Sequence, residues 1–344
     1  MPSNQQVLLD NRPTAQAVAS NFKLVRADTP ALKPGEVLVR HHFLSLDPYM
    51  RGRMNDSKNY AAAQGLGEVM VGGTVGEVAE SKNPKFAAGD NVVGMGGWQQ
   101  YSVVDADVVG ALRKVDTTHV PLSYYLGAVG MPGVTAYYGL VHIIEPKEGQ
   151  TLAVSAATGG VGSAFAALAK ARGCRVVGIA GGLEKCRYAL DELHFDACVD
   201  YKLHGTAESL SEALKAACPN GIDGYFENVG GLVLNAVLPL MNDFGRVAVC
   251  GMISGYDGQP TPLAQPTPLA QPMLILRSRL LMQGFIVAEQ MQVWPAALKE
   301  LGKLVGSGQL RPRESVAHGI AAAPEAFLGL LKGKNFGKQV VKLI

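Results

Sequence analysis

The segment 152–162 constrains the fold of this chain more than any other. It reads Leu-Ala-Val-Ser-Ala-Ala-Thr-Gly-Gly-Val-Gly, an apolar run that enters a Gly-rich turn, and the apolar spacing of 163–172 predicts a helix after it. Gly159 and Gly162 permit a tight turn and a close approach of the backbone to a pyrophosphate, whose charge would lie on the amide groups of the helix start. The pattern predicts a cradle for dinucleotide phosphates, formed by Ala157, Thr158, Gly159, Gly160, Val161 and Gly162.

The type of dinucleotide depends on the end of the next predicted strand, 175–180. A carboxylate there would accept a hydrogen bond from a ribose 2′-hydroxyl and would repel a 2′-phosphate. The chain has no Asp or Glu at this place and continues with Gly181, Gly182 and, soon after, Lys185. This composition favours NADP(H) over NAD(H). A Gly-rich turn alone is also compatible with an ordinary strand-to-helix turn, but here strand, turn, helix and second strand follow in order.

Length and composition restrict the number of domains and the class of protein to which the chain can belong. A chain of 344 residues is long for one core, so two domains are expected, and 48% hydrophobic residues are enough to fill both. A net charge of +2 with mixed signs is typical neither of a nucleic-acid binder nor of a polybasic membrane protein. The five cysteines form no C-x-x-C pair and have no metal-ligand spacing, which predicts reduced thiols in a cytoplasmic protein without a bound metal.

Two windows, 117–144 and 149–169, lack Asp, Glu, Lys and Arg and are long enough to cross a bilayer. Prolines and glycines interrupt the first, and the second contains the Gly-rich turn and few large aliphatic residues. We interpret both as buried core. The first thirteen residues are polar and contain no apolar signal core.

The spacing of apolar runs predicts an α/β protein with two different domains. Before about residue 126, short β-branched runs at 35–42, 69–78 and 91–93 lie between Gly and Pro residues, which indicates a β-rich domain. After it, strand-like runs alternate with helical stretches, which is typical of a doubly wound parallel sheet. These runs are 151–156, 175–180, 197–201, 224–227, 246–250 and 280–287, with a helix at 291–308. Residues 332–344 resemble a turn and a strand.

One segment is repeated without change: Thr-Pro-Leu-Ala-Gln-Pro occurs at 261–266 and again at 267–272. We interpret it as a tandem duplication within a loop, because a few extra residues in an open loop add little closure entropy. The repeat follows Tyr256 closely, so it either overhangs a pocket or is a plain surface loop.

Six motifs follow one another over nearly the whole chain. They lie at 45–54 (SLDPYMRGRM), 130–137 (GMPGVTAY), 156–162, 184–185, 227–231 (ENVGG) and 332–338 (KGKNFGK). Together they resemble, in register, those of one family, the zinc-independent medium-chain dehydrogenase/reductases that reduce activated alkenes. This group includes prostaglandin and leukotriene reductases, alkenal double-bond reductases and, as the branch that the chain resembles most, bacterial NADPH-dependent curcumin reductases.

This resemblance implies a GroES-like catalytic domain at 1–126, a Rossmann NADP-binding domain at 127–310 and a C-terminal segment, 311–344, that returns to the catalytic domain. It also implies a cleft between the domains that holds nicotinamide and substrate, and a homodimer. Zinc is not required in such a reaction, because the charge that develops on an enone is delocalised onto its carbonyl oxygen, which one or two hydrogen-bond donors can stabilise.

Three tyrosines are the candidate donors. Tyr256 follows a predicted strand end and matches the active-site tyrosine of the family; its phenol, with an ordinary pKa of about 10, is protonated at neutral pH. Tyr256 could instead stack on the cofactor while solvent supplies the proton. Tyr49 follows Asp47 and Pro48, where Asp47 is expected to cap a short helix and to pair with Arg51. Tyr60 lies in a polar loop, 55–64, either as a second donor or as an exposed aromatic.

The remaining candidates would bind the cofactor. Lys185 and Tyr201 match the family positions that hold the 2′-phosphate, and charge and a hydroxyl suit that ligand. Thr135 and Asn228 match positions near the phosphates and the nicotinamide, and Asn335 lies where the last segment would meet the cofactor. His41 and His42 occupy a strand-like run, and neither is assigned a role.

The sequence thus predicts an NADPH-dependent reductase of the carbon–carbon double bond in α,β-unsaturated ketones or aldehydes, with a small-molecule enone as its substrate. Two alternatives stay open. One is an NADPH quinone oxidoreductase of the same superfamily. The other is a non-catalytic NADPH-binding or sensing protein.

Overall fold

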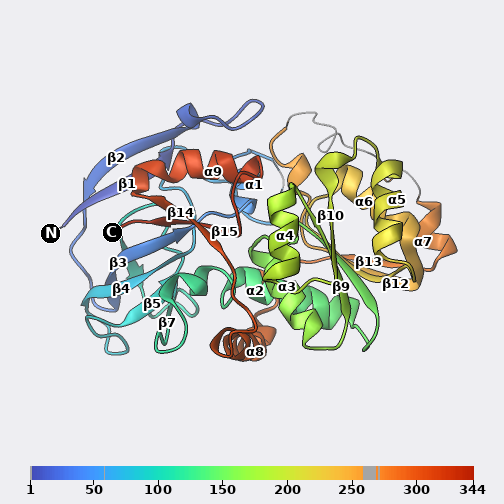
Figure 1. Cartoon of the computed structure of the whole chain (residues 1–344). Coiled ribbons are helices and arrows are strands. Elements are labelled where there is room, and N and C mark those ends of the chain that lie inside the picture. The colour runs from blue at the N-terminus through green and yellow to red at the C-terminus, as the bar shows by residue number, and fades with distance from the viewer. Residues whose placement is uncertain (1, 58, 259–268, 270–271) are drawn as a thin grey trace. The chain divides into compact units, whose positions relative to one another are not determined.

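A computed structural model of the chain describes residues 2–57, 59–258, 269 and 272–344. The chain divides into two compact units, one made of Met1–Gly127 with Glu314–Ile344 and the other of Ala128–Arg313 (Figure 1). Among the described residues, no helix is both long enough and apolar enough to span a bilayer. The repeated hexapeptide lies outside the described residues, apart from Leu269 and Pro272.

The first unit is rich in strands. Its main sheet has the order β14-β15-β3-β4-β5-β7, with β6 also paired to β3, and β1 and β2 form a separate antiparallel pair. The strands are β1 (Ser3–Leu9), β2 (Phe22–Asp28), β3 (Glu36–Ser45), β4 (Thr74–Ser81), β5 (Asn91–Gly94), β6 (Tyr101–Asp105), β7 (Leu112–Lys114), β14 (Glu314–His318) and β15 (Lys338–Lys342). The helices are α1 (Tyr49–Arg53) and α9 (Ala323–Leu331).

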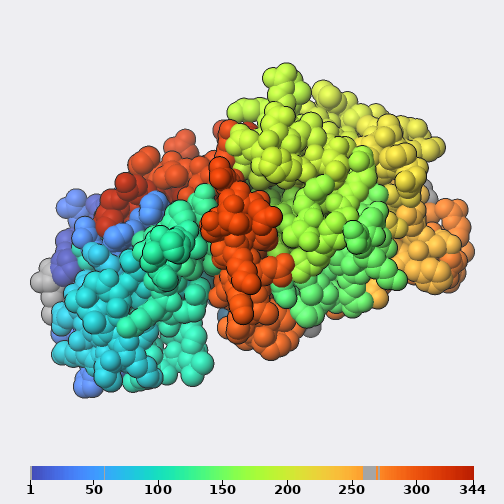
Figure 2. Space-filling view, turned by 60° about the horizontal axis from the view of Figure 1, so that its bottom comes forward, coloured from blue at the N-terminus to red at the C-terminus, as the bar shows by residue number. Residues whose placement is uncertain are grey.

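The late strand β15 completes this early sheet. It lies between β14, to which it is parallel, and β3, to which it is antiparallel, with Val341 opposite Leu44. Figure 2 accordingly shows red atoms from the end of the chain beside blue and cyan atoms from its beginning. The apolar side chains of β15, β1 and α9 share one core with Trp98, which stacks on Phe22 at 5.4 Å between ring centroids.

The second unit contains an all-parallel sheet of order β10-β9-β8-β11-β12-β13. Its strands are β8 (Thr151–Ser155), β9 (Arg175–Ala180), β10 (Ala197–Asp200), β11 (Ile222–Glu227), β12 (Met241–Val249) and β13 (Leu281–Gly284). Its helices are α2 (Met131–Tyr138), α3 (Gly160–Lys170), α4 (Leu183–Asp191), α5 (Ala207–Ala217), α6 (Gly231–Val237), α7 (Met273–Arg277) and α8 (Trp294–Gly306). The chain reverses its direction across the sheet between β8 and β11, and doubly wound sheets bind ligands at the carboxyl ends of such strands.

Helices cover both faces of this sheet. α5 packs with α6 over one face, where Leu210, Val233 and Tyr225 belong to one buried cluster. α3 packs with α2 and α8, and its Phe165 contacts Phe226 of β11 at 5.2 Å between ring centroids. β8 is buried throughout its length because helices cover both faces of the sheet, and its central residues, Leu152, Ala153 and Val154, are apolar.

The predicted fold class, a GroES-like β-rich domain with a Rossmann domain, is confirmed, and the predicted parallel strands all form. Several boundaries differ from the prediction, among them the following three. The run 69–78 becomes a strand only from Thr74, and the strand continues to Ser81. β12 begins at Met241 rather than at residue 246, and β13 is limited to Leu281–Gly284.

Candidate active site

The Gly-rich turn joins β8 to α3. Gly159 precedes the helix without a side-chain cap, and the first amide groups of a helix have no partner inside it. A Cβ on Gly162 would lie 2.5 Å from the carbonyl oxygen of Ala157 and 2.6 Å from that of Ala156, so only glycine lets the helix start this close to the turn. Ala157 and Thr158 are buried below it. The turn is therefore shaped to present bare backbone amides.

A second group of residues surrounds the end of β9. A Cβ on Gly181 would lie 2.9 Å from the Tyr201 hydroxyl and 3.0 Å from Cε of Lys202, so both side chains lie over this glycine. Gly182 has a φ of 105° and precedes α4, which carries Lys185 in its first turn. Partial burial and the charge of Lys202 lower the pKa of the Lys185 ammonium. Two cations thus gather around one turn, and a dianionic group placed between them would relieve their repulsion.

β9 has no acidic residue at its end, but the neighbouring strand, β10, does. Asp200, the last residue of β10, accepts hydrogen bonds from the backbone N–H of Gly182 at 2.8 Å and from that of Lys202 at 3.0 Å. Its carboxylate is therefore used to hold the turns that carry the two lysines.

Asn228 lies directly after β11. Its Nδ2 donates to the carbonyl oxygen of Ser155 at 2.8 Å, and its backbone N–H donates to Ser155 Oγ at 2.8 Å. Ser155 is the last residue of β8, so these bonds connect Asn228 with the strand that leads into the Gly-rich turn.

Tyr256 follows β12 and the short helix Ile253–Gly255. Its hydroxyl oxygen accepts a hydrogen bond from the backbone N–H of Met252 at 3.2 Å, and a Cβ on Gly251 would lie 2.9 Å from it. Burial is the largest of the effects that raise the pKa of Tyr256, and the charge of Glu227 adds to it. The phenol is thus held protonated with its oxygen as acceptor, and no described residue accepts its hydrogen.

Thr135 occupies α2, where its hydroxyl donates to the carbonyl oxygen of Met131 at 2.7 Å, and only 8% of the residue is exposed. Within the second unit, the cradle, the Gly181 turn, Asn228 and Tyr256 all follow carboxyl ends of the parallel strands. Thr135 instead belongs to a helix that packs on α3.

In the first unit, Tyr49 begins α1 and is half-buried. Burial first, and then the charges of Asp47 and Tyr60, raise the pKa of the Tyr49 phenol. Tyr60 itself is 54% exposed, and its loop is closed at the base by a 2.7 Å bond from the N–H of Gln64 to the carbonyl oxygen of Arg53.

Two predictions about this segment are wrong. Asp47 does not cap α1, whose N-cap residue is Pro48, and it does not pair with Arg51. Instead Asp47 Oδ1 accepts from Lys338 Nζ at 2.8 Å and Oδ2 accepts from Ser45 Oγ, all of them buried. Arg51 donates to Asn55 Oδ1 and to the carbonyl oxygen of Ala15. A partner 291 residues away cannot be recognised from local spacing.

Asn335 lies in the turn before β15, in the same unit as Tyr49. Its Nδ2 donates to the carbonyl oxygen of Gly337 at 2.7 Å, which stabilises the turn. The site residues predicted from the sequence thus belong to both units: Tyr49, Tyr60 and Asn335 to the first and the others to the second. It missed Lys202, which directly follows Tyr201, and Glu227, which directly precedes Asn228.

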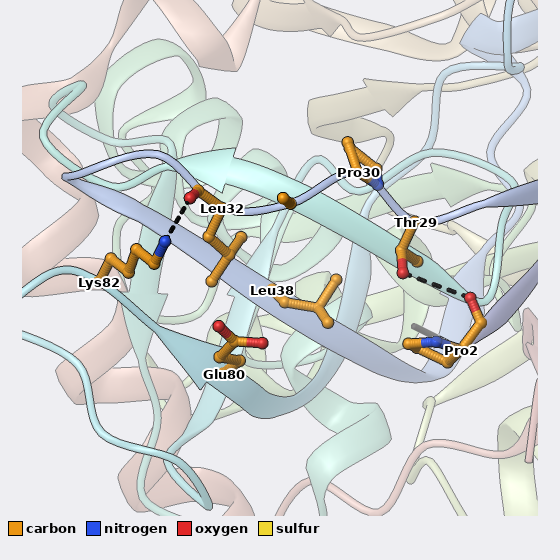
Figure 3. A pocket seen from close by; sticks show the side chains of 8 residues that line it. Pro2, Thr29, Pro30, Leu32, Leu38, Glu80 and Lys82 are labelled. Carbon is orange, nitrogen blue, oxygen red and sulfur yellow. Dashed lines mark hydrogen bonds between the residues drawn. The ribbon is translucent and has the colours of Figure 1, made fainter.

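A small cavity of about 240 Å³ lies elsewhere in the first unit. Figure 3 shows its lining, in which Lys82 donates to the carbonyl oxygen of Leu32 at 2.7 Å and Thr29 to that of Pro2 at 3.3 Å. None of its lining residues is a predicted site residue. In the part of the chain that the structure describes, no three His, Cys, Asp or Glu side chains are arranged to hold a metal ion. The cysteines are free thiols.

Comparison with known proteins identifies the family. Residues 5–112 match the family described as the N-terminal domain of oxidoreductase, and residues 160–303 match the one described as zinc-binding dehydrogenase. The chain is 45% identical to the NADPH-dependent curcumin reductase of Escherichia coli over 341 residues, which cover 99% of this chain and 97% of that protein. It is 41% identical to the NADP⁺-dependent 2-alkenal reductase of Nicotiana tabacum, covering 98% and 97%.

The chain belongs to the zinc-independent medium-chain dehydrogenase/reductases. It is an oxidoreductase, as predicted. A crystal structure of another member of this group, CurA from Vibrio vulnificus in complex with NADPH, matches with a TM-score of 0.90 and 44% identity over 99% of both chains. The two units described above thus correspond to the two domains of a medium-chain dehydrogenase/reductase.

Proposed function

We propose that this protein uses NADPH to reduce the carbon–carbon double bond of α,β-unsaturated ketones and aldehydes, such as curcumin-like enones and alkenals. The observation that carries the proposal is Tyr256, a phenol kept protonated at the edge of the sheet where the Gly-rich turn also lies. The names of the relatives support it, since they refer to reduction of curcumin and of 2-alkenals with NADPH or NADP⁺.

The residues present fit NADP(H). The bare amides of the α3 start suit a pyrophosphate, and Lys185 and Lys202 with the Tyr201 hydroxyl suit a 2′-phosphate. We propose that Ala157–Gly162, Gly181, Gly182, Lys185, Tyr201, Asn228, Thr135 and Asn335 bind the cofactor. The Thr135 hydroxyl would act as an acceptor toward the cofactor, because its hydrogen is used within α2.

NADPH, when bound, supplies the hydride that adds to the β-carbon of the substrate. Negative charge would then develop on the carbonyl oxygen of the substrate, and we propose that the Tyr256 hydroxyl donates a hydrogen bond to that oxygen. The α-carbon of the enolate then takes up a proton, which we propose comes from Tyr256, and the saturated product results. A phenol whose pKa is raised stays protonated through the neutral and mildly basic range, so it remains a donor. We propose Tyr49 and Tyr60 as further residues that contact the substrate.

We also propose that the protein is a cytoplasmic homodimer and that its domains are 1–126, 127–310 and 311–344. β13 supports the dimer, because it ends the parallel sheet and Leu281 on it is 42% exposed. Edge strands of this kind pair readily with another chain.

The reaction is tested by following NADPH oxidation with a linear enone, an alkenal, curcumin and a benzoquinone, each with and without chelator. We expect turnover of the first three, a preference for NADPH over NADH, and no effect of the chelator. Turnover of the benzoquinone alone would replace the proposal with a quinone reductase. If the protein binds NADPH but turns over none of these substrates, it is a non-catalytic NADPH-binding protein.

The role of Tyr256 is tested by Tyr256→Phe. Loss of a positioned acid typically lowers kcat about 100-fold, and we expect that loss here with an unchanged NADPH dissociation constant. Tyr101→Phe, in a strand of the first unit, is the matched control and is expected to keep full activity. A Tyr256→Phe enzyme with wild-type kcat would show that solvent supplies the proton and that the phenol only lines the site.

A further inference from the structure

Glu227, the last residue of β11, is a fully buried carboxylate with four hydrogen-bond donors. Ser155 Oγ and the backbone N–H of Gly230 donate to Oε1, both at 2.9 Å, and the N–H of Val229 donates to the same oxygen. The hydroxyl of Tyr225 donates to Oε2 at 2.9 Å. Burial is the main effect that raises the pKa of this carboxyl group, and the bonds from Val229, Gly230, Ser155 and Tyr225 oppose it.

The directions of these bonds are fixed by their partners. The two backbone N–H groups can only donate, so Oε1 must accept. Ser155 Oγ accepts from the N–H of Asn228, and its single hydrogen has two possible acceptors. Glu227 Oε1 at 2.9 Å is closer than the carbonyl oxygen of Phe226 at 3.4 Å, so we assign the hydrogen to Glu227. A continuous series of bonds thus runs from the Asn228 backbone through Ser155 to the carboxylate.

The same peptides support the segment that carries Tyr256. The carbonyl oxygen of Glu227 accepts from the N–H groups of Cys250 at 2.9 Å and Gly251 at 3.1 Å. The carbonyl oxygens of Asn228 and Val229 accept from Ile253 and Ser254, each at 3.1 Å. Glu227 fixes the turn 228–230, and that turn fixes 250–254, which leads directly to Tyr256.

We propose that Glu227 is a positioning residue, whose side chain holds Asn228 and the Tyr256 segment in register with the end of β8. The proposal rests on the function proposed above, in which Asn228 contacts the cofactor and Tyr256 the substrate. The length of the side chain matters more than its charge in this role, because one oxygen must accept hydrogen bonds from Ser155, Val229 and Gly230 at the same time.

Two variants separate the effect of side-chain length at position 227 from the effect of its charge. Glu227→Gln keeps the length and one oxygen acceptor, and its amide NH₂ can donate to the Tyr225 hydroxyl. Glu227→Asp keeps the charge but is shorter by one methylene. Asp223→Asn is the matched control, because Asp223 lies at the opposite end of β11 and likewise accepts from a backbone N–H, that of Thr151 at 2.8 Å.

The experiment measures the NADPH dissociation constant by fluorescence titration, kcat and KM with a linear enone, and thermal unfolding of each variant. In Glu227→Asp the shorter side chain withdraws the oxygen that bridges Ser155, Val229 and Gly230, so we expect this variant to bind NADPH about tenfold more weakly and to lose kcat. In Glu227→Gln we expect the NADPH dissociation constant and kcat to stay within about threefold of the wild-type values. Asp223→Asn should lower the unfolding temperature and leave NADPH binding unchanged.

Wild-type NADPH affinity and kcat in Glu227→Asp would overturn the proposal. Equal weakening of NADPH binding in Asp223→Asn would also overturn it, because the effect would then be general destabilisation. If the wild-type protein reduces no enone but Glu227→Asp still loses NADPH affinity, the proposed function fails and the positioning of the cofactor side remains supported.

Discussion

The residues around Gly181 explain how a chain without an acid at the end of β9 would select its cofactor. Lys185 comes from α4, Tyr201 and Lys202 come from the turn after β10, and Asp200 ties the two turns together. In the proposed site, selectivity for the cofactor would therefore depend on residues that follow two different strands, β9 and β10. The sequence pattern alone indicated only the first of the two lysines.

Lys185→Ala and Lys202→Ala should each weaken NADPH binding about tenfold, the usual effect of one lost charge-assisted hydrogen bond, and leave NADH binding unchanged. The measurement is the dissociation constant of both cofactors. Lys215→Ala, which removes an exposed lysine of α5 in the same unit, is the control. Equal losses of NADPH and NADH affinity would contradict the assignment of these lysines to a 2′-phosphate.

At the level of elements, the start of α3 depends on one glycine. Gly162→Ala should weaken NADPH binding at least about tenfold, since its Cβ would meet two backbone carbonyls at 2.5 and 2.6 Å and move the helix start. Gly302→Ala in α8 has no heavy atom within 4 Å of the added Cβ and should stabilise the protein by up to about 1 kcal/mol. Wild-type NADPH affinity in Gly162→Ala would contradict this account of the cradle.

The elements that could be predicted are those with a strong local pattern. β8, β9 and β11 are continuous apolar runs next to helical stretches, and the Gly-rich turn between β8 and α3 has its own signature. β1 and β2 were not predicted, because Ser3–Leu9 is polar in its first half and its pairing with Phe22–Asp28 depends on tertiary contacts. Lys338, Glu227 and Lys202 were missed for a related reason, since each has a neighbour that is distant in sequence. These neighbours are Asp47 for Lys338, Ser155 for Glu227 and Gly181 for Lys202.

At the scale of the whole molecule, one buried histidine should make stability depend on pH. His41 is 1% exposed and its ring bonds Ser102 Oγ at 2.8 Å; burial, with a smaller contribution from His42, lowers its pKa to about 3. Above pH 6.5 the ring is neutral in both states, and below it only the unfolded chain takes up the proton. Folding should therefore lose about 1.4 kcal/mol per pH unit as the pH falls from 6.5 toward 3.

This contribution can be measured by urea unfolding at pH 6.5 and pH 5. His41→Gln, which retains a hydrogen-bonding group for Ser102, should remove about 2 kcal/mol of the difference between the two pH values. His119→Gln replaces an exposed histidine of the same unit and should leave the difference unchanged. A wild-type pH dependence in His41→Gln would assign the effect to other groups.

The place of β15 has a consequence for synthesis on the ribosome. The β-rich unit cannot complete its sheet before residues 338–342 have been made, because β15 separates β3 from β14. The α/β unit, Ala128–Arg313, has all its strands earlier. Although domains usually fold from the N-terminus onward during translation, here the unit that is begun first would be the last to finish. The end of β3, Phe43–Ser45, has no β15 to pair with until the last residues of the chain have been made.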